Sequence, residues 1–250
     1  MGMVPIADDD SDLTLTPIVN YLLLALNIAV FVLFQGLGAN ERFTYAFSTV
    51  PKEIVTGRDV VTSPRKVEDP VSGHTYTQPG LEHTPSPVYI TLLTSMFMHG
   101  GLAHIFGNML YLWVFGNNIE NALGHLRYLI YYLVCGVLAS LAHVFATAAA
   151  GGNMLVPSLG ASGAISGVLG GYLLLFPKRR VRTWMGRGVV DMPAWTSLGM
   201  WFVFQLISGM GLLGEGAQAG GVAYAAHVGG FVAGLVLIKL FAAGRTASWR

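Results

Sequence analysis

The stretch Gly160-Ala161-Ser162-Gly163-Ala164-Ile165-Ser166-Gly167 decides the fold that we expect for this chain. It opens an apolar segment that continues to Phe176. A hydroxyl group between glycines at the start of a membrane-length helix is unusual, because polar side chains at membrane depth are costly and are usually functional. Ser162 is therefore the first candidate for a functional residue.

The composition is that of a membrane protein. Of the 250 residues, 53% are hydrophobic and only 11% are charged, whereas soluble domains carry about 25% charged residues. The formal net charge of +1 gives no indication of a nucleic-acid partner. The single cysteine, Cys135, lies in an apolar run and is expected to be a small core residue. Only an acidic segment, residues 8–12, precedes the first apolar run, so we expect a retained anchor rather than a cleaved signal peptide.

Six apolar segments approach the length of about 20 residues that a membrane-spanning helix needs. They are residues 17–35, 102–119, 126–149, 161–176, 194–213 and 225–243, with an apolar lead-in at 90–98 and a short polar turn at 120–125. The fourth segment is short, so we expect it to begin below the membrane surface. The sequence predicts an all-α membrane protein in which residues 17–243 form a bundle of six transmembrane helices. Residues 1–16 and 244–250 are the two tails.

The loop between the first two segments, residues 37–90, is long and rich in charged residues and proline. Its first part, from Phe43 to Val55, is amphipathic, and we expect it to lie on the membrane surface. Residues 63–87 are rich in Pro, Ser, Thr and Gly, which indicates an irregular loop.

Basic residues indicate the orientation. They cluster at 178–187, after the fourth segment, and are absent from the opposite short loops, 150–160 and 214–224. Because cytoplasmic loops are rich in Lys and Arg, we expect a multi-pass protein of the cell membrane with both termini in the cytoplasm. Residues 178–187 would anchor the inner face, and residues 8–12 would be a solvated tail.

In this topology the second, fourth and sixth segments run in the same direction, so their first residues share one level. The polar groups at these three ends are His99, His104 and Asn108, then Ser162, then His227. His104 and Asn108 are four residues apart and therefore share a helix face.

Glycines indicate which segments touch. Small residues at intervals of four allow membrane helices to pack closely, and such rows occur in the fourth segment, at Gly163 and Gly167, and in the sixth, at Gly230 and Gly234. Contact between these rows would bring the His227 ring within reach of the Ser162 hydroxyl.

These residue types suit nucleophilic catalysis. A serine hydroxyl needs an adjacent base, and histidine is the usual one because its pKa lies near neutrality. The nearest acid to His227 is Glu215 in the preceding loop, so we predict a Ser162–His227 dyad rather than a triad. The backbone N–H of Ser162 and the side chains of His104 and Asn108 are candidate oxyanion donors, although Asn108 could instead only join helices.

Three motifs resemble the rhomboid family of intramembrane serine proteases. They are His99-Gly100-Gly101-Leu102-Ala103-His104-Ile105-Phe106-Gly107-Asn108, Gly160-Ala161-Ser162-Gly163 and Ala226-His227-Val228-Gly229-Gly230 with Gly234, and Glu120 and Gly124 also fit. The resemblance covers residues 17–35 and 90–243. It implies that Ser162 is the nucleophile and His227 the base, with His104 and Asn108 in the oxyanion hole.

The resemblance also implies partners. The family cleaves transmembrane segments of other proteins near the surface of the lipid bilayer, often after small residues, and substrate entry would map to residues 194–224. We expect no cofactor and no metal, and we expect Gly160, Gly163, Gly230 and His99 to support the site. His99 would do so through a structural hydrogen bond that holds the first loop.

The sequence departs from the family at two places. Residues 37–90 lack the Trp-Arg pair that the family's first loop often carries. Some members have an aromatic residue one turn after the serine, packed on the histidine, where this chain has Ser166. The sequence alone therefore does not determine how His227 is oriented.

The sequence fits other functions less well than proteolysis. A zinc site is disfavoured because His99 and His104 are five residues apart and no His-Glu-x-x-His motif is present. A hydrolase nucleophile elbow requires Gly-x-Ser-x-Gly between a strand and a helix, and position 164 is Ala. A catalytically silent relative would usually lack the serine or the histidine. A channel or transporter would need polar residues along a whole span.

Overall fold

The computed structural model describes residues 4–68, 75–85, 87–209 and 221–245. Its α-helices are α1 (Ile18–Ala29), α2 (Glu41–Phe47), α3 (Pro51–Thr56), α4 (Thr91–Thr94), α5 (Leu102–Leu123), α6 (His125–Ala149), α7 (Ser162–Leu175), α8 (Ala194–Gly209) and α9 (Gly221–Ala242). A π-helical turn, Val30–Phe34, continues α1, and 3-10 turns at Val88–Ile90 and Ser95–Phe97 flank α4. The strands are β1 (Val4–Asp8), β2 (Arg65–Glu68), β3 (Thr75–Gln78), β4 (Arg180–Trp184) and β5 (Val189–Pro193).

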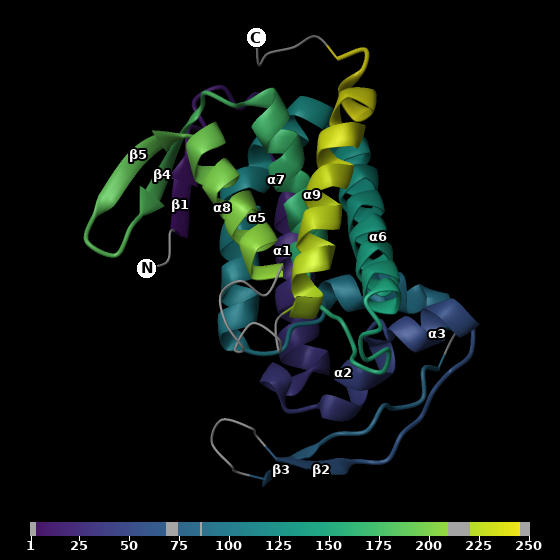
Figure 1. Cartoon of the computed structure of the whole chain (residues 1–250). Coiled ribbons are helices and arrows are strands. Elements are labelled where there is room, and N and C mark those ends of the chain that lie inside the picture. The colour runs from purple at the N-terminus through teal and green to yellow at the C-terminus, as the bar shows by residue number, and fades with distance from the viewer. Residues whose placement is uncertain (1–3, 69–74, 86, 210–220, 246–250) are drawn as a thin grey trace.

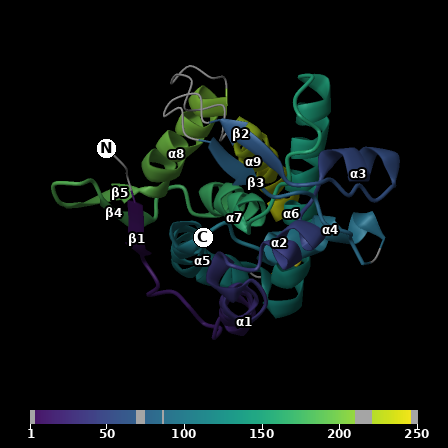
Figure 2. The same ribbon diagram turned by 90° about the horizontal axis from the view of Figure 1, so that it is seen from below.

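Helices α1, α5, α6, α7, α8 and α9 run side by side and form the bundle, with the first loop at one end and the last turn of α9 at the other (Figure 1). Helix α7 lies in the middle and contacts α5, α6, α8 and α9, as the view along the bundle shows (Figure 2). Every residue from Gly163 to Tyr172 is buried. The segment that carries Ser162 is therefore the central helix of the molecule.

Six apolar helices occur where six spans were expected, but their lengths differ. Two of them, α6 and the Tyr224–Ala242 part of α9, are long and apolar enough to cross a membrane, and a third candidate combines Val88–Phe97 with α5 across a bend of 80°. Ile18–Phe34, Ser162–Leu175 and Ala194–Ile207 are shorter apolar helices. A membrane crossing by all six helices stays a prediction.

Glycines bring α7 and α9 into backbone contact, as the sequence predicted. A methyl group on Gly230 would lie 2.1 Å from the carbonyl oxygen of Gly163, and one on Gly234 would lie 2.0 Å from that of Gly167. Gly163 and Gly167 of α7 face α6, since methyl groups on them would lie 2.7 Å from the Ala139 Cβ and 2.4 Å from the Cys135 Cβ. At this level of the bundle, Gly230 and Gly234 therefore allow α9 to approach α7, whereas Gly163 and Gly167 allow α7 to approach α6.

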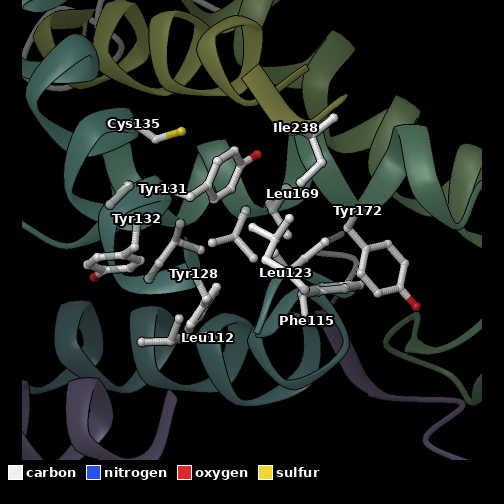
Figure 3. Packing of buried hydrophobic residues seen from close by; sticks show 14 of the residues in the cluster. Leu112, Phe115, Leu123, Tyr128, Tyr131, Tyr132, Cys135, Leu169, Tyr172 and Ile238 are labelled. Atoms are coloured by element: carbon white, nitrogen blue, oxygen red, sulfur yellow. The ribbon is translucent and has the colours of Figure 1, made fainter. Parts of the chain in front are cut away.

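Tyrosines fill the core between α5, α6, α7 and α9 (Figure 3). The Tyr131 hydroxyl lies 2.7 Å from the Gly167 carbonyl oxygen and 3.1 Å from that of Gly234. A buried phenol needs such partners, and here they are the peptide groups that the glycines leave uncovered. Cys135 is buried in the same core, as expected.

A buried carboxylate joins α1 to α5. Both oxygens of Glu120, at the end of α5, accept N–H groups from the first turn of α1, Val19 at 2.9 Å and Asn20 at 2.7 Å. Helix α5 extends beyond the expected span to Leu123, and Gly124 alone separates it from α6, where a polar turn at 120–125 was predicted. Gly124 has a φ of 78°, which favours glycine.

The prediction of an all-α protein is wrong in two places. Strands β2 and β3 pair antiparallel within residues 63–87, where an irregular loop was expected. Strands β1, β4 and β5 form a second antiparallel sheet, with β4 in the middle. The basic segment after α7 is thus a β-hairpin, and the N-terminal segment adds the third strand to it (Figure 1).

The acidic segment, residues 8–12, is not a solvated tail. One Asp8 carboxylate oxygen accepts hydrogen bonds from the Tyr172 hydroxyl at 2.8 Å and from the Asn118 amide at 2.7 Å. Asp12 forms an ion pair with Arg179 at 2.9 Å. The segment therefore joins the ends of α5 and α7, because these ends offer donors that a run of acids can accept.

Helix α8 is attached where it starts. The N–H of Ala194 donates to the Arg179 carbonyl at 2.8 Å, and that of Trp195 donates to the Pro177 carbonyl at 3.0 Å. Strand β5 ends directly before it, so the start of α8 is fixed to the sheet.

Candidate active site

A tight turn places Ser162 at the start of α7. Gly160 has a φ of +124°, and a methyl group on it would lie 2.9 Å from the His104 ring. The N–H of Gly160 donates to the Ser95 carbonyl at 2.8 Å. Both the backbone conformation and the close approach require glycine here. The turn therefore sets the distance between His104 and Ser162.

The first loop holds the segment before this turn. Thr49 and Ser158 exchange backbone hydrogen bonds of 3.0 and 2.8 Å, and the Thr49 hydroxyl lies 2.8 Å from that of Ser95. The loop between the first two segments thus packs against the same short elements that hold Gly160.

The expected contact between Ser162 and His227 is present. The His227 Nε2 lies 2.8 Å from the Ser162 Oγ, and the residues come from the facing helices α7 and α9. A nucleophile and a base within this distance can transfer a proton directly.

His104 presents an N–H group to the same space. Its Nδ1 accepts the Gly100 N–H at 3.2 Å, so the proton of the neutral ring is on Nε2. A methyl group on Gly160 would lie 2.9 Å from this Nε2, which shows how closely the ring approaches the turn before Ser162. The ring is therefore oriented as a donor on the serine side.

Two further donors lie nearby. The N–H of Ser162 is in the first turn of α7, where backbone N–H groups lack partners inside the helix. Asn108 is buried, and its side-chain amide donates to the His104 carbonyl at 3.1 Å. One amide hydrogen of Asn108 is therefore used within α5, and the amide has a second one.

These residues border an open cavity of about 310 Å³ between α5, α7, α8 and α9. Its lining consists of Ala103, His104, Gly107, Asn108, Tyr111, Leu159, Ser162, Ile165, Ser166, Leu169, Trp201, Gln205 and His227. The lining is apolar apart from a few polar groups at the serine end, a combination that suits an apolar peptide segment.

The structure adds a residue that sequence reasoning missed. The Gln205 Oε1, on α8, lies 2.8 Å from the His227 Nδ1, and the Gln205 side chain is only 7% exposed. A single amide in the middle of a mostly apolar segment was a visible signal in the sequence, because polar groups at membrane depth are usually functional. Sequence alone gave no indication of which face of α8 turns toward His227.

Aromatic rings also surround His227, although Ser166 replaces the aromatic residue found in some relatives. The Trp201 ring lies 6.1 Å from the imidazole, and the Tyr224 ring lies 6.4 Å away, edge-on. The Ser166 hydroxyl donates to the Ser162 carbonyl at 2.7 Å and is buried. The aromatic packing on the histidine therefore comes from α8 and α9.

His99 is buried beside His104, with ring centroids 5.2 Å apart. Its ring lies edge-on to that of Phe31 in the first segment, with centroids 6.5 Å apart, and its backbone makes the hydrogen bonds to that segment. The His99 N–H and carbonyl both bond to the Gln35 side chain, each at 2.9 Å. Glu215, the acid nearest to His227 in sequence, lies outside the described residues.

The model of the rhomboid domain matches residues 87–244. The chain belongs to the rhomboid family. The matched range includes the Gly160 turn, both members of the Ser162–His227 contact and Gln205. Together with the composition and the apolar helices, the family makes this rhomboid a membrane protein.

Several curated relatives are similar to this rhomboid. Rhomboid protein 1, mitochondrial, of Saccharomyces cerevisiae is 29% identical over 86% of this chain and 51% of its own length. Rhomboid protease GluP of Bacillus subtilis is 32% identical over 57% of this chain and 24% of its own. The human presenilin-associated rhomboid-like protein, mitochondrial, is 38% identical over 36% of this chain and 23% of its own length. This chain thus spans about half or less of the relatives it matches.

Proposed function

We propose that this rhomboid is an intramembrane serine endopeptidase that works through a Ser162–His227 dyad. The observation that carries the proposal is the distance of 2.8 Å between the Ser162 Oγ and the His227 Nε2 at the border of an apolar cavity. Membership of a family of intramembrane serine proteases, and a relative named as a protease, support it.

The geometry supports the following sequence of steps. The Ser162 Oγ attacks the carbonyl carbon of the scissile bond while its proton passes to the His227 Nε2. The oxyanion accepts hydrogen bonds from the Ser162 N–H, the His104 Nε2–H and the Asn108 amide. His227 then gives its proton to the leaving nitrogen, and the amine departs from an acyl-enzyme. Water attacks this ester with His227 as base, which releases the acid and restores Ser162.

The substrates in this proposal are transmembrane segments of other proteins. The cavity is bordered by α5 on one side and α8 on the other, so a segment would approach Ser162 between these helices. Small residues near the cut would fit beside the Gly160 turn, and a locally unwound helix would expose its peptide bond. The reaction needs no cofactor or metal in this scheme, and the lipid bilayer supplies the surroundings.

The dyad is tested with purified protein in lipid vesicles and a panel of fusions, each with a transmembrane segment that has small residues near its outer end. Wild type should cleave, whereas Ser162→Ala and His227→Ala should lose at least about 1,000-fold in kcat/KM, as expected for loss of nucleophile or base. Ser11→Ala and His83→Ala are matched controls in exposed segments and should retain full activity.

Two results would contradict the proposal. Cleavage by both dyad variants at the wild-type rate would remove Ser162 and His227 from the mechanism. Binding of the whole panel without cleavage by wild type would instead identify a catalytically silent relative.

We also propose that this rhomboid lies in a cell membrane with both termini in the cytoplasm. The cluster of basic residues at 178–187 supports this orientation. Asn153 is exposed in the short connection between α6 and α7, at the serine end of the bundle. A cysteine at position 153 should react with an impermeant thiol reagent added to intact cells. Reaction only after permeabilisation would reverse the orientation.

A further inference from the structure

Gln205 is the polar side chain of α8 that reaches the base. It is 7% exposed, although neighbouring α8 residues such as Val203 and Phe204 are more than half exposed. Its Oε1 lies 2.8 Å from the His227 Nδ1, on the side of the ring opposite the contact with Ser162. A buried amide costs free energy unless it is hydrogen-bonded, and this hydrogen bond is directed at the base itself.

The hydrogen bond selects one tautomer of the ring. His227 can accept the Ser162 proton only if Nε2 carries no hydrogen, and in the neutral ring the proton must then be on Nδ1. A proton on Nδ1 needs an acceptor, and the amide oxygen of Gln205 is one. The opposite tautomer would direct an N–H at Ser162 and leave the serine without a base.

Among the described residues that line the cavity, no carboxylate competes with Gln205 for the His227 Nδ1. The residues that line the cavity include no Asp or Glu, and the flanking rings of Trp201 and Tyr224 restrict the imidazole by contact only. In a Ser-His-Asp triad a carboxylate fixes the tautomer and stabilises the imidazolium. A neutral amide can fix the tautomer, but it stabilises the charged ring less.

We infer that Gln205 is the positioning residue of the base, an uncharged counterpart of the carboxylate in a catalytic triad. The inference rests on the proposed function, in which His227 is the base. Gln205 acts through His227 and does not touch the reacting atoms. Because Gln205 is on α8 and His227 is on α9, the competence of the base depends on where α8 lies.

Two substitutions separate positioning from packing. Gln205→Met keeps the length of the side chain and removes the acceptor, so kcat should fall about 10- to 100-fold, with KM within about twofold of wild type. Gln205→Glu keeps an acceptor and adds a negative charge, which favours the imidazolium. It should retain activity and move the acid limb of the kcat/KM profile up by about one pH unit.

A control on the same helix is Thr196→Val. It removes one polar group about 13 Å along the axis from Gln205, at 1.5 Å per residue. Its kcat and its pH profile should match those of wild type.

A second readout does not depend on proteolysis. In protein with ¹⁵N-labelled histidine, the ring nitrogens of His227, identified by their loss in His227→Ala, report the tautomer. Wild type should show a protonated Nδ1 and an unprotonated Nε2 at neutral pH. Gln205→Met should show a mixture of tautomers, and Thr196→Val should show the wild-type pattern.

The inference is overturned if Gln205→Met keeps the wild-type ring pattern, whatever its rate, or if Gln205→Glu has the acid limb of wild type. A loss of rate in Gln205→Met without a change in the ring pattern would make Gln205 a packing residue. If Ser162→Ala cleaves as wild type does, the proposed function fails, and the ring nitrogens still decide whether Gln205 fixes the tautomer.

Discussion

The hydroxyl of Ser162 lies where it does because of the turn at Gly160. This glycine has a φ of +124° and approaches the His104 ring so closely that a methyl group would lie 2.9 Å from it. Gly160→Ala therefore adds backbone strain and displaces His104 at once. We expect a stability loss of about 1 to 3 kcal/mol together with at least about a tenfold loss in kcat, since oxyanion donors are worth about that or more.

Gly151 provides the matched control. It also has a positive φ, +65°, but nothing lies within 4 Å of where its methyl group would be. Gly151→Ala should lose stability and keep its kcat. Melting in detergent and cleavage rates measure both effects, and equal activities for the two variants would show that His104 does not depend on the Gly160 turn.

Site residues could be predicted from the sequence where the chemistry of the side chain itself indicates a function. Ser162, His227 and His104 could be selected because hydroxyl and imidazole groups at membrane depth are costly and are usually functional. Gln205 was not selected, since an amide in the middle of an apolar segment points to its partner only once the helix faces are known. Which face of α8 turns toward α9 depends on how the helices pack, and the sequence of α8 alone does not determine it.

At the scale of elements, the contact between α7 and α9 determines the distance between Ser162 and His227. Gly234→Ala would place a methyl group 2.0 Å from the Gly167 carbonyl oxygen, so the helices must separate. We expect a loss of about 1 to 3 kcal/mol, typical of overpacking, visible as a lower melting temperature in detergent.

Gly199 of α8 is the comparison for this variant. It has open space around it, and alanine favours a helix over glycine by about 1 kcal/mol. Gly199→Ala should therefore melt at or above the wild-type temperature. If Gly234→Ala also melts there, the close contact of the two helices contributes nothing to stability.

Element boundaries followed from the sequence where glycine or proline bounds an apolar run, as for α6 and α7. They did not follow where polar residues join one helix to another. Residues 120–123 read as part of a turn because Glu120 and Asn121 are polar and Gly124 follows, yet they continue α5, and Glu120 binds the first turn of α1. The strands β2 and β3 were missed because their residues are polar and flanked by turn formers.

At the scale of the whole molecule, the acidic N-terminal segment gives stability a dependence on pH. Burial raises the pKa of Asp8 from 3.8 to about 7. Between these values the folded chain holds a proton that the unfolded chain has lost. The free energy of unfolding therefore falls as pH rises through this window, by up to about 1.4 kcal/mol per pH unit.

Asp8→Asn removes the titrating group and keeps an oxygen that can accept from Tyr172 and Asn118. We expect it to flatten the decline between pH 4 and 7 and to be more stable than wild type at pH 8. Asp9→Asn is the control, because Asp9 is exposed and hydrogen bonds from Ser11 lower its pKa. Chemical unfolding across this pH range measures both, and an unchanged slope in Asp8→Asn would contradict the assignment.

The association of this segment with β4 could not be predicted from pattern alone. Val4 pairs with Trp184 and Asp8 with Val181, positions far apart in the chain. A run of acids in a tail usually stays in solvent. It folds here because Arg179, Asn118 and Tyr172 meet at one end of the bundle, and only the tertiary structure brings them together.

The fixed start of α8 gives this helix the mechanics of a hinged arm. Gln205 lies about 16 Å along the axis from Ala194, so a rotation of about 10° at the sheet would carry its amide through about 3 Å. Outward, a displacement of this size would lengthen the 2.8 Å contact between Gln205 and His227 well beyond hydrogen-bond distance. An outward rotation of α8 that widens the opening between α8 and α5 would break the hydrogen bond from Gln205 to His227 in the same movement. A substrate segment could then not enter while Ser162 is paired with a correctly oriented His227. Cleavage would follow only after α8 had returned to the position seen here.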